Sequence, residues 1–400
     1  MSFTSVMTPV SQRATVAQIL GLATAVPNNS IAQSDAALVA QQLKLSQRWN
    51  DALPALYRKS GVLRRGSVLL DTNDVPLSDR QSFYLPADET NPFGPTTAER
   101  MNIFAQHAGP LLKIACSQAI HNSKILASRI THLVSVSCTG FFAPGVDIAL
   151  IESLGLDSNI QRTHVGFMGC HGALNAIRVS KSIVDADPSA VVLLGAIELC
   201  SLHQQYTDDA QQLVANALFA DGAAALVIGA GTHEATDPSK DIQNGILEQS
   251  VADGLAWNIA STFSKWIPNT TNLMSWTIGN HGFRMSLDPL VPSFIESNLE
   301  SELAAWLATH DMRVSDIDAW AIHPGGPRII QATGNALNLP APLLQPSKDV
   351  LANHGNMSSP TVLFILERLE KESPRALNCV LLAFGPGLCI EAVLLRRFSE

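Results

Sequence analysis

Apolar segments without regular polar alternation constrain the fold of this chain most strongly. Four of them consist almost entirely of valine, leucine, isoleucine and alanine: 190–196, 223–228, 379–384 and 388–395. A strand with apolar side chains on both faces is covered on both sides, as in sheets packed between helices. The sequence therefore predicts a layered α/β fold.

Helices alternate with these strands in a similar order in both parts of the chain. Each part is predicted to contain a long helix followed by a strand: 99–121 and 130–136 in the first, 291–310 and 318–322 in the second. The intervening segment 231–240 is polar and rich in turn residues, which is typical of a boundary. The sequence predicts two similar halves, at residues 14–233 and 244–400.

Composition limits the possible functions. The chain has 400 residues, of which 46% are apolar and 15% charged, so a large core is expected. A net charge of −9 argues against nucleic acid as a partner. No secretory signal opens the chain, and no apolar stretch approaches the roughly 20 residues that span a bilayer. The scattered cysteines lack metal-ligand spacing and indicate free thiols in a reducing cytoplasm: Cys116, Cys138, Cys170, Cys200, Cys379 and Cys389.

One cysteine lies where a helix is expected to begin. Cys170 stands between Gly169 and Gly172, and the apolar residues that follow recur at helical spacing: Ala173, Leu174, Ile177 and Val184. A thiol at a helix N-terminus meets free N–H groups and the positive end of the dipole, which both favour the thiolate. Cys170 is therefore a candidate nucleophile, and an inert buried cysteine is the alternative.

A histidine and an asparagine occupy comparable junctions. His323 ends an apolar strand and precedes a Gly/Pro turn, where ligands of α/β proteins bind; a satisfied core histidine is the alternative. Asn356 precedes Ser359 and Pro360, which are predicted as the N-cap and first residue of a helix. Capping and turn chemistry alone would be the alternative for Asn356. Together, a Cys nucleophile and two hydrogen-bond donors to a thioester oxygen make a decarboxylative condensing site.

The segments around these residues resemble type III polyketide synthases, the chalcone-synthase-like branch of the thiolase superfamily. The resemblance runs from about residue 15 to the C-terminus and is carried by Cys170 and by four further segments: His-Pro-Gly-Gly-Pro at 323–327, Gly-Asn-Met-Ser-Ser at 355–359, Phe-Gly-Pro-Gly at 384–387, and 217–225. It implies a thiolase-like five-layer αβαβα fold built from two similar halves, and a homodimer. It makes Cys170 the nucleophile, with His323 and Asn356 as the decarboxylation pair.

The same resemblance implies a set of substrate-binding residues. Phe219 matches an aromatic gatekeeper between the CoA tunnel and the cavity, and Phe283 matches a second gatekeeper. Ser358 and Gly387 match cavity-lining positions, and Lys59 matches a CoA-contacting base. Arg58, Arg64 and Arg65 are further candidates for that charge, with a solvated helix end as the alternative.

Segment 137–145 is closer to bacterial alkylpyrone- and alkylresorcinol-forming members than to plant ones. Cys138 and Ala143 stand where plant enzymes usually have Thr and Met. These residues, and the largely apolar segment 139–151, predict an acyl pocket; packing at a subunit interface is the alternative. The starter is therefore expected to be a fatty acyl-CoA.

The predicted reaction is iterative condensation of malonyl-CoA onto an acyl-CoA starter held on Cys170, followed by cyclisation to a pyrone or phenolic lipid. No metal and no other cofactor is implied, because neither a ligand cluster nor a phosphate-binding loop is present in the sequence. Two alternatives stay open. One is a single-round ketoacyl synthase of the fatty-acid initiation type, and the other is a non-catalytic thiolase-fold subunit that binds acyl-CoA.

Overall fold

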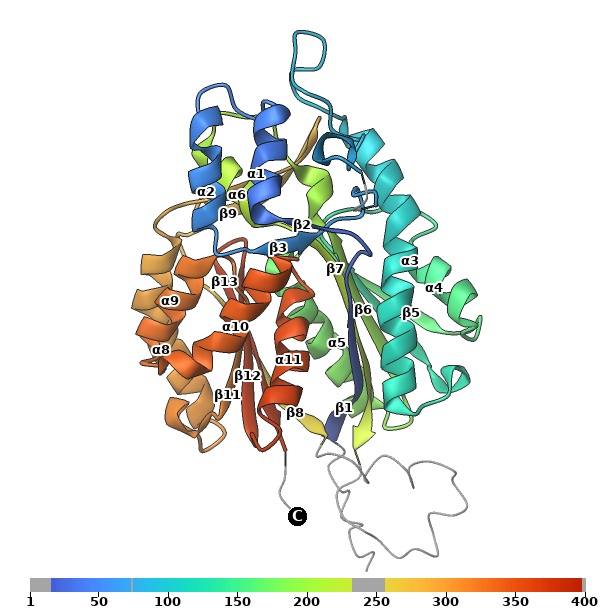
Figure 1. Ribbon diagram of the computed structural model, residues 1–400. Helices are drawn as coiled ribbons and strands as arrows, with labels where there is room; N and C mark the ends of the chain where they lie inside the picture. The colour runs from blue at the N-terminus through green and yellow to red at the C-terminus, as the bar shows by residue number, and fades with distance from the viewer. Residues whose placement is uncertain (1–15, 73–74, 232–255, 398–400) are drawn as a thin grey trace, which may run out of the picture.

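The computed structural model describes residues 16–72, 75–231 and 256–397, and Figure 1 shows its arrangement. All four predicted limits (14, 233, 244 and 400) and nearly all of the predicted boundary segment lie outside these residues. The first half contributes five strands to the main sheet: β1 (Val16–Ala25), β4 (His132–Ser137), β5 (Gln161–Gly166), β6 (Val192–Leu199) and β7 (Asp221–Gly231). The second half contributes four: β8 (Trp257–Trp266), β11 (Ala319–Ile322), β12 (Asn378–Gly385) and β13 (Cys389–Arg396).

Strand pairing repeats between the halves. The sheet order is β11-β12-β13-β8-β1-β7-β6-β4-β5. In the first half β4 is parallel to β6, while β6–β7 and β7–β1 are antiparallel. In the second half β11 is parallel to β12, while β12–β13 and β13–β8 are antiparallel. Within the main sheet, the two halves are joined where Gln18 and Ile19 of β1 pair with Asn258 and Trp257 of β8. The described strands thus have the predicted two-fold repetition.

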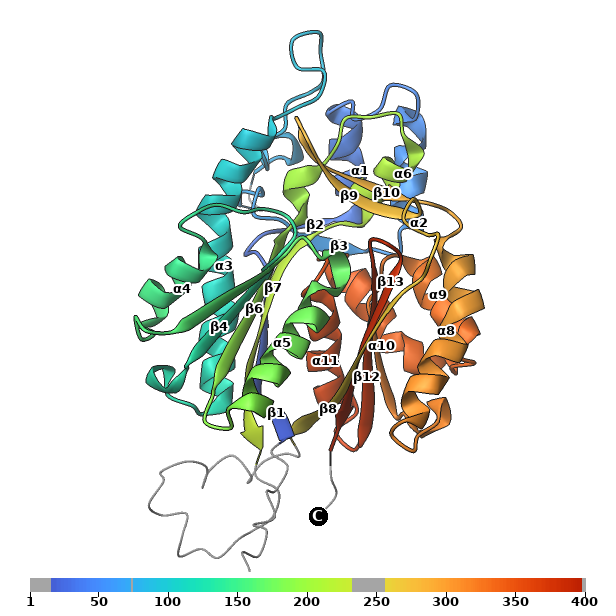
Figure 2. The same ribbon diagram turned by 180° about the vertical axis from the view of Figure 1, so that it is seen from behind.

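Helices complete five layers, which Figures 1 and 2 show from opposite sides. Two helices cover the outside of the first half and three cover the second: α3 (Thr97–Ser123) and α4 (Val146–Leu154), then α8 (Val291–Ala308), α9 (Pro327–Ala336) and α10 (Ala341–His354). Between the two sets of strands lie α5 (Gly172–Ala186) and α11 (Thr361–Glu372). Both central helices contact strands of both halves.

Side-chain alternation along the strands produces this layering. Val134 and Val136 of β4 pack into the central core with α5 and α11, whereas Leu133 packs outward with α3. In β12, Leu381 points to the central core and Leu382 to the core shared with α8 and α9. Strands such as β6 and β12 therefore bury both faces, which explains the apolar runs, whereas the edge strand β5 is largely exposed. The α/β prediction is confirmed.

A smaller cap lies over one end of the strands (Figure 1). Its elements are β2 (Ser30–Ala32), α1 (Gln33–Gln42), α2 (Leu53–Lys59), β3 (Arg64–Gly66), α6 (Ala210–Leu218), β9 (Met274–Gly279) and β10 (Gly282–Leu287). Within the described ranges no helix is both long and apolar enough to cross a membrane.

Candidate active site

Cys170 lies in a 3-10 turn, Gly169–His171, that runs directly into α5. The predicted helix start is confirmed, and the thiol is 7% exposed. Ser358 approaches it with a hydroxyl, at 3.7 Å from Oγ to Sγ. The thiol of Cys138 lies beside the same turn and accepts a hydrogen bond from the Gly169 N–H at 3.0 Å. The nucleophile candidate is therefore held by a rigid turn between two polar neighbours.

The resting environment of Cys170 does not favour the thiolate, which is contrary to the sequence-based expectation. Burial raises the pKa of the Cys170 thiol to about 12, against the opposing effect of the Ser358 hydroxyl. The nearby Glu198 carboxyl raises that pKa further. Loss of solvation outweighs the helix terminus here. As a nucleophile, Cys170 would therefore first have to pass its proton to a base.

His323 follows β11, and its backbone N–H donates to the carbonyl of Leu382 at 2.8 Å. The residue is 1% exposed, and neither ring nitrogen has a hydrogen-bond partner in the described part of the chain. Burial, with a smaller effect of the neighbouring His171, lowers the pKa of His323 to about 3. The ring is therefore neutral at physiological pH, with one nitrogen free to accept a proton and one able to donate a hydrogen bond.

Asn356 is fixed by its backbone and its side-chain oxygen. Its N–H donates to Leu218 and its carbonyl accepts from Ala220, both at 2.9 Å, while Oδ1 accepts from the Ser358 N–H at 2.8 Å. Gly355 has φ of +75°, and a Cβ there would press on the Leu218 carbonyl. The side-chain NH2 has no partner among the described residues and remains available as a donor. Glycine at 355 thus allows this close approach to α6.

The helix prediction after Asn356 was wrong in detail. α11 begins at Thr361 with Pro360 as its N-cap, so Ser359 is not the cap. Ser359 instead donates from Oγ to Oε1 of Glu198 at 2.7 Å. The competing buried carboxylate explains the difference, because an unpaired buried charge costs more than an uncapped helix end.

Cys170, His323 and Asn356 line one cavity, which we term the central cavity. A second cavity, the thiol cavity, is lined by Cys138, Cys170 and Cys200, among others. Because Cys170 borders both spaces, a group attached to its sulfur can extend into the thiol cavity while a second reactant occupies the central one.

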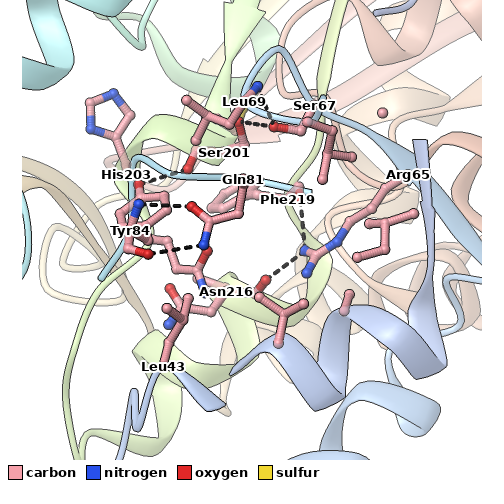
Figure 3. A pocket seen from close by; sticks show the side chains of 18 of the residues that line it. Leu43, Arg65, Ser67, Leu69, Gln81, Tyr84, Ser201, His203, Asn216 and Phe219 are labelled. Carbon is pink, nitrogen blue, oxygen red and sulfur yellow. Dashed lines mark hydrogen bonds between the residues drawn. The ribbon is translucent and has the colours of Figure 1, made fainter. Parts of the chain in front are cut away.

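A third cavity, the outer cavity, lies under α1 and is shown in Figure 3. Apolar residues such as Ile31, Val39 and Leu43 line one part of it. Phe219 lines all three cavities, and Cys200 and Trp276 line both the thiol and outer cavities. Phe219 is thus common to the walls of all three cavities, and its role as a gatekeeper stays a prediction.

Phe283 is placed differently from Phe219. It is 0% exposed, stacks on His203 with centroids 4.2 Å apart, and is not among the residues that line the three cavities. Met285, two residues further along β10, lines the central and thiol cavities opposite Phe219. The structure thus gives Met285 the position that sequence reasoning assigned to Phe283. The Gly-Phe-Arg-Met sequence contained the signal, because residues two apart share one strand face.

The other predicted substrate-binding residues divide into two groups. Cys138 and Ser358 line the thiol cavity. Ala143, Gly387 and Lys59 line none of the three cavities: Ala143 and Lys59 are exposed, and the Gly387 carbonyl accepts a hydrogen bond from Trp266. Of segment 139–151, Thr139 alone lines the thiol cavity, so the predicted acyl wall is not found there in the single chain.

The basic residues near Lys59 also take separate directions. Arg58 and Arg64 are exposed, whereas Arg65 turns inward and donates to the carbonyls of Asn216 and Phe219 at 2.6 and 2.9 Å (Figure 3). Arg65 therefore holds the backbone at Asn216 and Phe219. Across the described ranges, no group of three or more His, Cys, Asp or Glu residues could hold a metal ion.

Glu198 was missed by sequence reasoning. It is fully buried beneath Cys138, and its carboxyl accepts from the Cys138 N–H at 2.9 Å, the Thr139 hydroxyl at 2.7 Å and Ser359. Burial raises its pKa to about 7, although these hydrogen bonds oppose the shift. A glutamate inside an apolar strand, 192–199, was the available signal.

The sequence of this chain matches those of known proteins over nearly its whole length. Residues 6–232 match the model of the chalcone and stilbene synthase N-terminal domain, and residues 258–399 match that of the C-terminal domain. The chain is 35% identical over 392 residues to "Alpha-pyrone synthesis polyketide synthase-like Pks18" of Mycobacterium tuberculosis, covering 96% of this chain and 92% of the relative.

Two further similarities agree. The chain is 33% identical to 1,3,6,8-tetrahydroxynaphthalene synthase of Streptomyces peucetius subsp. caesius, over 93% of this chain and 91% of that one. The crystal structure of PKS-I from the brown alga Ectocarpus siliculosus superposes with a TM-score of 0.85 at 27% identity, covering 97% of this chain and 100% of that one. The chain therefore belongs to the chalcone and stilbene synthase family and is a type III polyketide synthase, an acyltransferase.

Proposed function

We propose that this enzyme condenses malonyl-CoA repeatedly onto a fatty acyl starter held on Cys170, and that cyclisation then releases a pyrone or a phenolic lipid. The observation that carries the proposal is the position of Cys170 on the border between two cavities, with His323 and Asn356 in one of them. The starter would occupy the thiol cavity, and malonyl-CoA the central cavity.

In the loading step, the Cys170 proton passes to the free nitrogen of His323. The thiolate attacks the starter thioester, a Cys170 thioester forms, and CoA leaves as a thiolate that recovers the proton. Burial raises the pKa of the Cys170 thiol, so its proton has to be transferred to His323 before the attack. Only the loading step needs this proton transfer.

In the extension step, His323 and the Asn356 NH2 donate hydrogen bonds to the malonyl thioester oxygen. Loss of CO2 leaves an enolate, whose negative charge these donors stabilise by about 3–4 kcal/mol each. The enolate carbon attacks the Cys170 thioester and expels Cys170 as a thiolate. That thiolate then recaptures the lengthened chain from CoA, so later rounds require no new deprotonation.

A fatty starter is supported by the residues that the cavities share. Cys200, Phe219 and Trp276 line both the thiol and outer cavities, and the apolar Val39 and Leu43 also line the outer cavity. An acyl tail that leaves Cys170 through the thiol cavity would reach Val39 and Leu43. The relative Pks18, whose name describes α-pyrone synthesis, is consistent with a pyrone product.

Narrowing the outer cavity should shorten the preferred starter. In Val39→Trp, the indole would occupy space beside the tail, and each displaced methylene loses about 0.8 kcal/mol, or about fourfold in kcat/KM. Leu38→Trp is the matched control, because Leu38 is the preceding residue of α1 and is 47% exposed. The measurement is kcat/KM across hexanoyl- to palmitoyl-CoA. If the two variants had equal chain-length profiles, the acyl tail would not bind in the outer cavity.

Product mass tests the function as a whole. Incubation with malonyl-CoA and a panel of acyl-CoA starters should give products with several added two-carbon units. A single added unit would identify a one-round ketoacyl synthase, and stoichiometric Cys170 acylation without turnover would identify a non-catalytic binding subunit. Coumaroyl-CoA, or malonyl-CoA alone, as the sole accepted starter would contradict the fatty starter.

We also propose that the enzyme is a homodimer that uses the face around β5. This edge strand is largely exposed, and Phe141, Phe167 and Met168 nearby are 54%, 39% and 38% exposed. Proteins usually cover an exposed strand edge and an exposed apolar patch with another element or another subunit. Light scattering should give twice the 42.8 kDa chain mass; a monomer at micromolar concentration would contradict this. The cytoplasmic location stays a prediction.

A further inference from the structure

Two helix ends meet at the loop that carries Asn356. α6 ends at Leu218 and α10 ends at His354, and the residues that follow them, Phe219 and Asn356, form an isolated parallel bridge. In this bridge the Asn356 N–H donates to the carbonyl of Leu218, and the Asn356 carbonyl accepts from the N–H of Ala220. The position of the Asn356 amide in the central cavity therefore depends on where the backbone at the end of α6 lies.

Arg65 of β3 closes the end of α6. One guanidinium nitrogen, Nη1, donates to the carbonyls of Asn216 and Phe219, as Figure 3 shows. The last carbonyls of a helix have no partner within the helix and carry the negative end of its dipole, so a cation is favourable there. In the described ranges no ion pair joins Arg65 to a carboxylate. Its charge therefore acts on the end of α6.

The strand that carries Arg65 is also tied to the end of α10. Leu63, just before β3, donates its N–H to the carbonyl of Ala352 in the last turn of α10, at 2.7 Å. A Cβ added at Gly355 would lie 3.4 Å from the Cβ of Arg65. Arg65 thus packs directly beside the residue that precedes Asn356, and β3 contacts both of the helix ends that meet there.

We propose that Arg65 is a positioning residue for decarboxylation, which fixes the Asn356 amide by holding the ends of α6 and α10 in register. The inference rests on the role proposed above for Asn356. Without the guanidinium, two carbonyls at the end of α6 lose their donor, and the bridge between Phe219 and Asn356 shifts with them. A displacement of about 1 Å at a reacting group can cost about 10²-fold in rate.

Loading of the starter does not use this support. Cys170 lies in the turn Gly169–His171, and that turn is held by the hydrogen bond from the Gly169 N–H to the thiol of Cys138. None of the hydrogen bonds of Arg65 reaches the turn. The two half-reactions should therefore respond differently to a change at Arg65.

Arg65→Met tests this difference, because methionine keeps an unbranched apolar stem but has no guanidinium. At saturating malonyl-CoA, CO2 release should fall by about 10–100-fold. Acylation of Cys170 by the starter, followed by intact-protein mass, should stay near the wild-type rate. Arg65→Lys keeps a charge and a donor, so it should recover part of the lost decarboxylation.

Arg48→Met is the matched control. Arg48 lies between α1 and α2, is exposed and lines none of the three cavities. Its guanidinium lies over the ring of Trp49, 4.8 Å from the centroid. Both half-reactions should keep the wild-type rate in this variant.

A double variant separates positioning of Asn356 from an independent effect. If Arg65 acts through Asn356, Arg65→Met combined with Asn356→Ala should decarboxylate no more slowly than Asn356→Ala alone, since residues that act as a unit are not additive. A double variant slowed by the product of the two single effects would overturn the inference. An unchanged kcat with a raised KM for both CoA substrates would also overturn it, because Arg65 would then bind CoA.

Thermal unfolding verifies that each variant is folded. A folded Arg65→Met enzyme with wild-type decarboxylation, or with an equal fall in loading, would contradict the positioning role. Should Arg65→Met fail to fold, Arg65→Lys takes its place in the same double-variant comparison. Failure of the proposed function is distinct, because Asn356→Ala would then decarboxylate malonyl-CoA at the wild-type rate whatever the Arg65 variants do.

Discussion

Replacing Cys170 with alanine should abolish polyketide formation, with a fall of at least about a thousandfold to the assay background. The acyl chain then has no sulfur on the border between the central and thiol cavities. Malonyl-CoA decarboxylation should persist at a slow rate, because His323 and Asn356 remain in the central cavity. Product mass and the release of CO2 or acetyl-CoA measure the two activities separately.

Cys116→Ala is the matched control for this loss. Cys116 is also buried, but it belongs to α3, packs in the outer core and lines none of the three cavities. Its substitution should leave product formation near the wild-type rate. Chain extension by the Cys170→Ala enzyme, for instance through Cys138 or Cys200, would exclude Cys170 as the sole acyl carrier.

Removing the Asn356 amide should stop the cycle after loading. In Asn356→Ala, one donor to the developing enolate is lost, so decarboxylation should fall by about 10²–10³-fold. Cys170 acylation should continue, because the Cys170–His323 pair is intact, and the starter should accumulate as a covalent adduct that intact-protein mass detects. If this variant turned over malonyl-CoA at the wild-type rate, Asn356 would have no catalytic role.

His323→Gln should give a different pattern from Asn356→Ala. Glutamine can donate a hydrogen bond, but it cannot take the Cys170 proton, so both loading and decarboxylation should fall and no adduct should accumulate. Asn353→Ala is a control from the same segment, since Asn353 is exposed and its amide donates only to Asp349. If His323→Gln loaded the starter as fast as Asn356→Ala, another base would have to serve Cys170.

The main elements and the three central residues were predictable because they depend on local pattern. Apolar runs identify doubly covered strands, and Cys170, His323 and Asn356 stand at strand and helix ends where Gly and Pro mark turns. Their meeting in one cavity was not a local property, because β5 before Cys170 and β11 before His323 stand at opposite ends of the sheet order and Asn356 follows α10.

The substrate pocket was less predictable, because it depends on which neighbouring side chain reaches the cavity. Met285 and Phe283 lie on one face of β10, yet Met285 lines the central cavity while Phe283 stacks on His203. Likewise Ala143 follows Cys138 by only five residues but lies at the surface of the single chain.

The sequence by itself determined the α/β class, the repeated order of elements and the residues that carry the proposed chemistry, since periodicity and junction motifs are local properties. Only the tertiary structure decided the protonation of the site. Burial of Cys170, Glu198 and His171 in one low-dielectric region reverses the thiolate preference that a helix start alone would confer. Desolvation depends on every segment packed around a group, and no single segment contains that information.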